Sequence, residues 1–512
     1  MNRIKRWVFW GVVWLGLGML ARAAEKRDWR IFTTANFEML TDGSDRQAEV
    51  ALERLERYRA AAIRMQGERI ISRLPVRVYL LLSDDEFSWM RSVGKLGRGT
   101  IGIYRPTQNE NLLAVATVDD KESEGSVLLH EYNHLLLRGY QWDWPMWLCE
   151  GFALILETVE LRGDRAVFGK PVPFYGAYLL RRGLMPMSEF FEFERSEKNE
   201  NDQEKMTLVY AQSWAVCHYL YFGLREERQR EVLDFIHQVA RGTPVAEALQ
   251  ATLKMTPEEL QEAVEQHLRG GRIRTAGYLL PPEMKDLPKP ARRQVEAGVA
   301  EAWLGDWALE VGNREKAEQR YRTSLARSPG NAAGSVGLGR VLAAQKKYPE
   351  AIDSLRQATE KDPQSGWAWY QYGSVLLESA RAGMPDGTNR TEIPAACLEA
   401  LNRASELMPK HPGPVRELAR AKKTQGAKLQ EIVDTYGRAA ALDPADLLLP
   451  IEVALLLAKR GQRQVALTYL DSVNSRTFSG TIGEAVRVFR KAVENSSTPE
   501  ELEKELAKLS EE

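Results

Sequence analysis

Residues 125–138 read Gly-Ser-Val-Leu-Leu-His-Glu-Tyr-Asn-His-Leu-Leu-Leu-Arg, with the pattern HEYNH at 130–134. The leucines on either side favour a helix that buries its apolar residues. Two histidines four residues apart lie one turn apart on the same helix face, which suits two nitrogen ligands of one tetrahedral zinc ion. Glu131 lies about 100° around that helix, where its carboxylate can hold water without binding the metal. The stretch predicts a metal-binding helix over 125–138.

The next segment offers a third ligand. From position 144 it reads Trp-Pro-Met-Trp-Leu-Cys-Glu-Gly-Phe-Ala, and Pro145 suits the first position of a second helix, predicted over 145–159. Glu150 then lies on the second turn, and the small Gly151 would let the two helices approach closely. A catalytic zinc site has three protein ligands and an open fourth position, so we expect Glu150 to complete a site for one Zn2+ ion.

The motif HExxH followed by Trp-x-x-Glu-Gly-x-Ala resembles the gluzincin metallopeptidases, and among them the peptidase-MA-like secreted proteins of bacteria. The resemblance implies an α+β peptidase domain over 28–275 that hydrolyses peptides or proteins. It implies that His130, His134 and Glu150 bind zinc and that Glu131 is the general base.

Two features depart from that family pattern. Only fifteen residues separate His134 from Glu150, and Leu154 stands where thermolysin-like members carry an aspartate. A carboxylate normally orients a ligating histidine. Glu157, two turns after Glu150 on the same face, is the expected substitute. Cys149 points about 100° away from Glu150, so we expect a buried apolar role for this cysteine.

A peptidase also needs a donor that stabilises the oxyanion and a surface that binds the peptide. An oxyanion needs a hydrogen-bond donor, and Tyr210 stands where similar families carry a tyrosine before a helix. A plain aromatic core residue is the alternative for this position. His218 is expected to be a core histidine with both nitrogens satisfied. By resemblance, the strand 112–117 is expected to be the sheet edge that binds an extended peptide.

A second pattern begins after a segment rich in proline. Residues 276–293 hold four prolines within ten positions and predict a linker, and prolines at 329 and 363, then at 409 and 444, recur 34 and 35 residues apart. Small and large residues repeat at fixed distances before them. This period resembles tetratricopeptide repeats, which predicts an all-α solenoid over 294–490, with an insertion near 382–391 and a charged tail over 491–512.

The N-terminus resembles an export signal. Three basic residues precede a thirteen-residue apolar run and an Ala-Arg-Ala site, so residues 1–23 predict a signal peptide, with an uncleaved anchor as the alternative. The run is too short for an ordinary membrane span, so no stable span is expected once the signal is removed. The protein is therefore expected in the periplasm or outside a bacterial cell. Its net charge of −1 gives no reason to expect nucleic acid as a partner.

Three functions fit these features. The first is an exported zinc peptidase whose repeats recruit a protein partner or the substrate. The second is a catalytically silent, peptidase-like scaffold whose repeats mediate protein–protein interaction in the cell envelope. The third is a repeat protein that assists assembly of secreted polymers around a structural metal, although structural zinc sites usually have four protein ligands and the sequence offers three.

Overall fold

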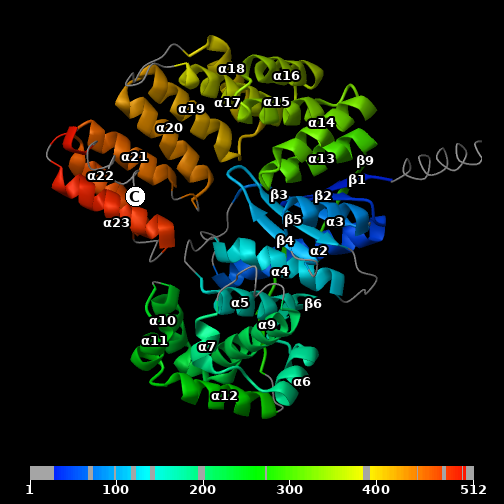
Figure 1. The fold of residues 1–512 in the computed structure, drawn as a ribbon, viewed down its shortest axis with the longest axis vertical. Coiled ribbons are helices and arrows are strands. Elements are labelled where there is room, and N and C mark those ends of the chain that lie inside the picture. The colour runs from blue at the N-terminus through cyan, green and yellow to red at the C-terminus, as the bar shows by residue number, and fades with distance from the viewer. Residues whose placement is uncertain are drawn as a thin grey trace, which may run out of the picture.

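The computed structural model describes residues 28–502 except 67–72, 83, 97–99, 117–122, 139–143, 194–201, 241, 271–273, 384–392, 445, 447, 475–479, 497 and 499. The predicted signal peptide, most of the predicted insertion and the end of the charged tail lie outside these residues. Figure 1 shows the repeats arching over a central sheet, with a second group of helices on the far side of the sheet.

The central sheet has six strands in the order β4-β5-β3-β2-β1-β9. β2, β3 and β5 are parallel to one another, whereas β4, β1 and β9 each run antiparallel to their neighbours. The strands span Arg30–Thr33 (β1), Phe37–Thr41 (β2), Val76–Leu81 (β3), Gly102–Pro106 (β4), Asn111–Ala116 (β5) and Ala291–Gln294 (β9). The strand predicted at 112–117 is therefore an inner strand, and the prediction that it forms the sheet edge is wrong. β4 lies at that edge.

Side chains point alternately to the two faces of the sheet along each strand, and helices cover both faces. Met39, Val78 and Leu113 point into the core shared with α2 (Asp45–Gln66) and α4 (Ser123–Arg138). Their neighbours Leu40, Tyr79 and Leu112 point to the opposite face, where they pack against α3 (Asp84–Val93) and α13 (Ala297–Glu310). The first helix of the repeats, α13, is therefore part of the hydrophobic core on this face of the sheet.

The far group of helices begins with α5 (Met146–Glu157) and packs α5 against α9 (Gln203–His218). A Cβ atom at Gly151 would lie 2.5 Å from the carbonyl oxygen of Ser213 and 2.3 Å from Cys217 Sγ. Gly151 therefore permits close approach to α9, and not to α4 as the sequence suggested. The remaining helices of this group are α6 (Pro173–Arg182), α7 (Met187–Phe191), α10 (Gln229–Ala240), α11 (Val245–Thr252) and α12 (Pro257–Arg269).

The proline-rich segment 276–293 is part of the fold. β8 (Ala276–Leu279) pairs with β7 (Arg165–Phe168), which pairs with β6 (Glu160–Arg162) to complete a small antiparallel sheet. β9 then pairs with β1 at the edge of the main sheet. The chain returns to the first domain before the repeats begin, so the segment is not the free linker that its composition predicts.

The repeats are pairs of antiparallel helices with the predicted period. First helices begin at residues 297, 332, 366, 412 and 448, and the wider third interval contains the insertion. Glycine allows the helices of a pair to meet: a Cβ atom at Gly305 would lie 2.7 Å from the ring of Tyr321. The helices after α13 are α14 (Arg314–Arg327), α15 (Ala332–Ala344), α16 (Tyr348–Lys361), α17 (Gly366–Ala382), α18 (Ala395–Leu407), α19 (Pro412–Gln425), α20 (Leu429–Leu442), α21 (Leu448–Lys459), α22 (Arg463–Asn474) and α23 (Gly480–Asn495).

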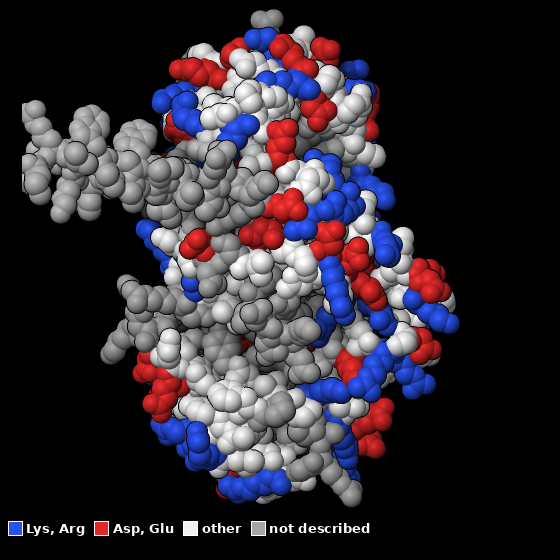
Figure 2. Space-filling model, turned by 90° about the vertical axis from the view of Figure 1, so that its right-hand side faces the viewer, with Lys and Arg blue, Asp and Glu red and all other residues white. Residues whose placement is uncertain are grey.

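Within the described part of the chain, no helix is both long and apolar enough to cross a bilayer. In the part of the face that Figure 2 colours, Lys and Arg are interspersed with Asp and Glu, and neither charge gathers into a continuous field. This mixed surface is in keeping with the near-zero net charge.

Candidate metal centre

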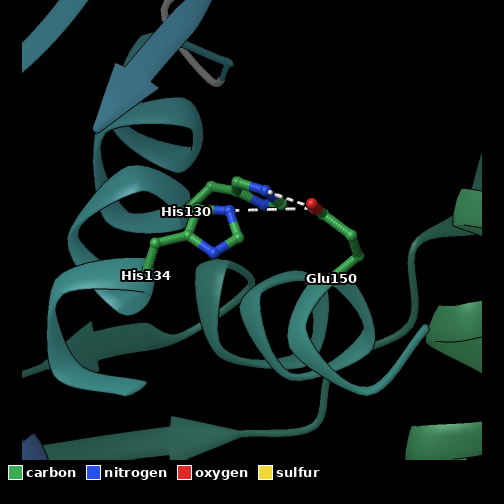
Figure 3. Close-up of side chains that lie close together, drawn as sticks. All are labelled: His130, His134 and Glu150. Carbon is green, nitrogen blue, oxygen red and sulfur yellow. Dashed lines mark hydrogen bonds and ion pairs between the residues drawn. The ribbon is translucent and has the colours of Figure 1, made fainter. Parts of the chain in front are cut away.

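Two neighbouring helices bring the three predicted ligands together. His130 and His134 project from α4 toward Glu150 of α5 (Figure 3). Glu150 Oε2 lies 3.2 Å from His130 Nε2 and 3.7 Å from His134 Nε2. Two ligand atoms on a tetrahedral zinc with bonds of about 2.0–2.1 Å lie roughly 3.3 Å apart, so this spacing suits one such ion. The side chains are 5 to 19% exposed, which leaves the group shielded but open on one side.

Glu157 lies behind His130, as the helical spacing predicts. Its Oε2 atom is 2.7 Å from His130 Nδ1, so the imidazole presents Nε2 to the centre of the site. Burial acts to lower the pKa of His130, but hydrogen bonds to Glu150 and Glu157 outweigh it and raise that pKa well above its usual value. Two carboxylates therefore make the site favourable for a positive charge, whether a proton or a metal ion.

The motif residue Asn133 fixes the two ligand-bearing helices relative to each other. It is fully buried on α4, and its side-chain nitrogen donates to the carbonyl oxygen of Ala153 on α5 at 3.3 Å. Its side-chain oxygen accepts a hydrogen bond from Tyr58 of α2. A buried amide with both ends bonded holds three helices in one register, and that register brings Glu150 to the histidines.

Cys149 contacts the site from the other side. Its Sγ atom lies 3.3 Å from His134 Nδ1. The residue is half-buried, whereas the sequence predicted a buried apolar role for it. Cys149 and the adjacent Glu150 both reach the imidazole of His134, because its two nitrogens face different directions. Cys149 and His134 also line a cavity of about 610 Å³ whose walls include Leu137, Trp144 and Val245. The site therefore opens onto a largely apolar hollow.

The edge strand β4 borders Glu131. A Cβ atom at Gly102 would lie 2.8 Å from Glu131 Oε1 and 2.5 Å from Val127 Cγ1, so only glycine fits here without a shift of these side chains. β4 pairs with β5 through one edge, and no described strand pairs with its other edge. The carboxylate of the motif thus lies beside the start of an edge strand.

Tyr210, the predicted oxyanion donor, does not lie where the family pattern places it, and a second tyrosine lies near the site. Tyr210 lies in the middle of α9, half-buried against the core of the domain, and not before a helix. Tyr175 of α6 was missed by sequence reasoning because only packing brings it near. Burial raises the pKa of Tyr175, and Glu157 and then Glu150 add to this effect, so its phenol lies within electrostatic range of both carboxylates.

His218 is a satisfied core histidine, as expected. It is fully buried, with Nε2 2.9 Å from the carbonyl oxygen of Gly169 and Nδ1 2.9 Å from His267 Nε2. Burial lowers the pKa of His218 and lowers that of His267 to about 4.

Comparisons with known proteins concern the repeats. A tetratricopeptide-repeat family model matches residues 304–366. The structure is similar to that of pilF from Pseudomonas aeruginosa at 21% identity, covering 42% of this chain and 91% of that one, with a TM-score of 0.33. It is also similar to a tetratricopeptide-repeat protein of Thermus thermophilus at 14% identity, covering 38% of this chain and 98% of that one, with a TM-score of 0.32. No curated protein matches the chain.

The C-terminal part of the protein is thus a tetratricopeptide-repeat solenoid, an architecture suited to protein–protein interaction.

Proposed function

We propose that this protein is a zinc-dependent peptidase of the gluzincin type, joined to a protein-binding repeat solenoid. The observation that carries the proposal is the convergence of His130, His134 and Glu150, whose ligand atoms lie within 4.8 Å of one another, with Glu157 on the far nitrogen of His130. Three protein ligands leave one position for water or substrate, which is typical of catalytic zinc. A zinc ion held there would polarise the scissile carbonyl and lower the pKa of water.

The chain's own residues supply the other functions. Glu131 takes the proton of the attacking water and passes it to the leaving amine. β4, which borders Glu131, has one edge that no described strand covers, and an extended peptide can add there as a further strand. Tyr175 and Tyr210 are the two candidates for the donor that stabilises the oxyanion. The apolar cavity beside His134 would receive a side chain of the substrate.

A second candidate function is a silent scaffold, in which the repeats bind a partner and the peptidase-like domain serves only for docking. The repeat match favours it, because that match supports protein binding and says nothing of hydrolysis. In either case we propose that the protein acts outside the cytoplasm of a bacterium, since its first residues resemble a signal peptide.

Hydrolysis of a mixed, fluorogenic peptide library by the zinc-loaded protein separates the two. We expect cleavage by the wild type, and a loss of at least about 1,000-fold in kcat for Glu131→Gln with zinc content unchanged. The matched control is Glu160→Gln on β6, whose carboxylate pairs with Arg162 and Lys170. Cleavage by Glu131→Gln at the wild-type rate would show that Glu131 is not the general base, and absence of cleavage by the wild type would rule out the peptidase.

A further inference from the structure

The turn between β4 and β5 enters the repeats. Hydrogen bonds within the turn close it: Thr107 N donates to the Glu110 carbonyl at 3.0 Å, and Thr107 Oγ1 accepts from the amides of Asn109 and Glu110 at 3.2 and 3.0 Å. Glu110 is buried, with a carboxylate oxygen 3.4 Å from Arg77. Asn109 forms the tip of the turn, and residues of the solenoid hold it there.

Three donors of the solenoid converge on the two oxygens of Asn109. Tyr370 Oη and Arg416 Nη2 each donate to Asn109 Oδ1 at 2.8 Å. His411 Nδ1 accepts from the Gly413 amide, so its Nε2 carries the proton and donates to the Asn109 carbonyl at 3.0 Å. The Arg416 side chain is 3% exposed, so this bond is made away from water, where a missing partner is costly.

The donors belong to one face of the solenoid. Tyr370 lies on α17 and Arg416 on α19, and these first helices of consecutive repeats contact each other along the array. Figure 1 shows the β4–β5 end of the sheet directed toward these helices. The same series of first helices continues to α13, where Asp306 forms an ion pair with Arg77 of β3 at 2.9 Å.

The other end of the same hairpin lies at the candidate metal centre. β4 runs from Gly102, which borders Glu131, to Pro106, which precedes the turn. Along the way Arg105 donates to the Glu310 carbonyl of α13 at 3.1 Å. One five-residue strand therefore connects the general-base candidate to the repeats.

We propose that this face of the repeats is an internal receptor for the β4–β5 turn, and that its occupation by Asn109 holds β4 in place beside Glu131. Asn109 is thus a positioning residue. A partner that needs the face formed by Tyr370 and Arg416 must first displace the turn, which would couple partner binding to the edge strand. The docking does not depend on peptidase activity, whereas its effect on hydrolysis rests on the proposed function.

Amide hydrogen exchange over residues 102–106 of the full-length protein tests the docking. Asn109→Ala removes the acceptor Oδ1, and we expect exchange in β4 to become at least about 10-fold faster while β2 and β3 are unchanged. Asn109→Asp keeps an acceptor for both donors and is expected to retain protection. Tyr370→Phe removes one donor with little change of shape and should give an intermediate effect.

Arg420→Ala is the matched control, because Arg420 lies one turn after Arg416 on α19 but pairs with Glu417 and Glu452 inside the repeats. Unchanged protection of β4 in Asn109→Ala would overturn the proposal, as would equal loss in Arg420→Ala. So would failure of Asn109→Asp to retain protection.

Peptide hydrolysis by the same variants tests the consequence for Glu131. We expect kcat/KM to fall about 10-fold in Asn109→Ala and to stay near wild type in Asn109→Asp, in step with the exchange data. Activity independent of β4 protection would contradict the link to Glu131. If the wild type cleaves no peptide, the proposed function fails, and the exchange experiment still decides whether the turn is docked.

Discussion

Two pairs of histidines in the first domain have opposite electrostatic surroundings. His130 faces the carboxylates of Glu150 and Glu157, and its pKa is raised. His218 and His267 meet each other and a backbone carbonyl, and the pKa values of both are lowered. The spacing of ring nitrogens alone therefore does not define a cation site. The carboxylates do, because they offset the cost of placing positive charge in a partly buried place.

Removal of one ligand from each pair should show the largest difference. We expect His130→Ala to weaken zinc binding by at least about 1,000-fold, because two remaining ligands hold zinc poorly. His267→Ala should leave zinc affinity within about 2-fold of wild type, because its surroundings disfavour a cation. Competition with a fluorescent zinc chelator measures both values. Equal zinc affinity in the two variants would mean that the ion binds elsewhere.

A smaller effect is expected from the carboxylate behind the ligand. Glu157→Gln keeps the shape of the side chain but removes the charge that orients His130, and such changes typically cost about 10- to 100-fold in metal affinity. Glu160→Gln, on the neighbouring strand β6, is the matched control and should have no effect. The same chelator competition applies, and a Glu157→Gln affinity equal to that of the control would show that Glu157 plays no part in metal binding.

The smallest expected effect is a loss of stability at low pH that comes from His267, in the pair formed by His218 and His267. The pKa of His267 is about 4 in the fold and near 6.5 when unfolded, so the unfolded chain binds more protons below pH 6.5. Stability from this group is present above pH 6.5 and is lost as the pH falls toward 4. With allowance for its partial exposure, we expect about 1 kcal/mol of this loss by about pH 5, absent in His267→Gln. Urea unfolding at about pH 7 and about pH 5 checks it, and an identical pH dependence in both proteins would contradict the lowered pKa.

The parts of the site that lie close in sequence were predictable. His130, His134, Glu150 and Glu157 fall within 28 residues on two helices, and helical periodicity alone places the first two on one face. The repeats were predictable for a similar reason, since a fixed period encodes stacked helix pairs. The structure confirms the solenoid and brings the predicted ligands together.

Other features depend on packing between distant segments, which periodicity does not encode. Asn109 meets residues 261 to 307 positions away, and β9 returns to the first sheet from beyond the proline-rich stretch. Composition there favoured a linker because a short, exposed edge strand has no apolar pattern of its own. Tyr175 likewise approaches the carboxylates only because α6 packs on α9.

Anomalous diffraction at the zinc edge, from crystals of the zinc-loaded protein, tests the central claim most directly. We expect one strong peak about 2.0–2.2 Å from His130 Nε2, His134 Nε2 and a carboxylate oxygen of Glu150, with Glu157 still bonded to His130 Nδ1. A map without a peak between α4 and α5, or with zinc bound only at His218 and His267, would contradict it.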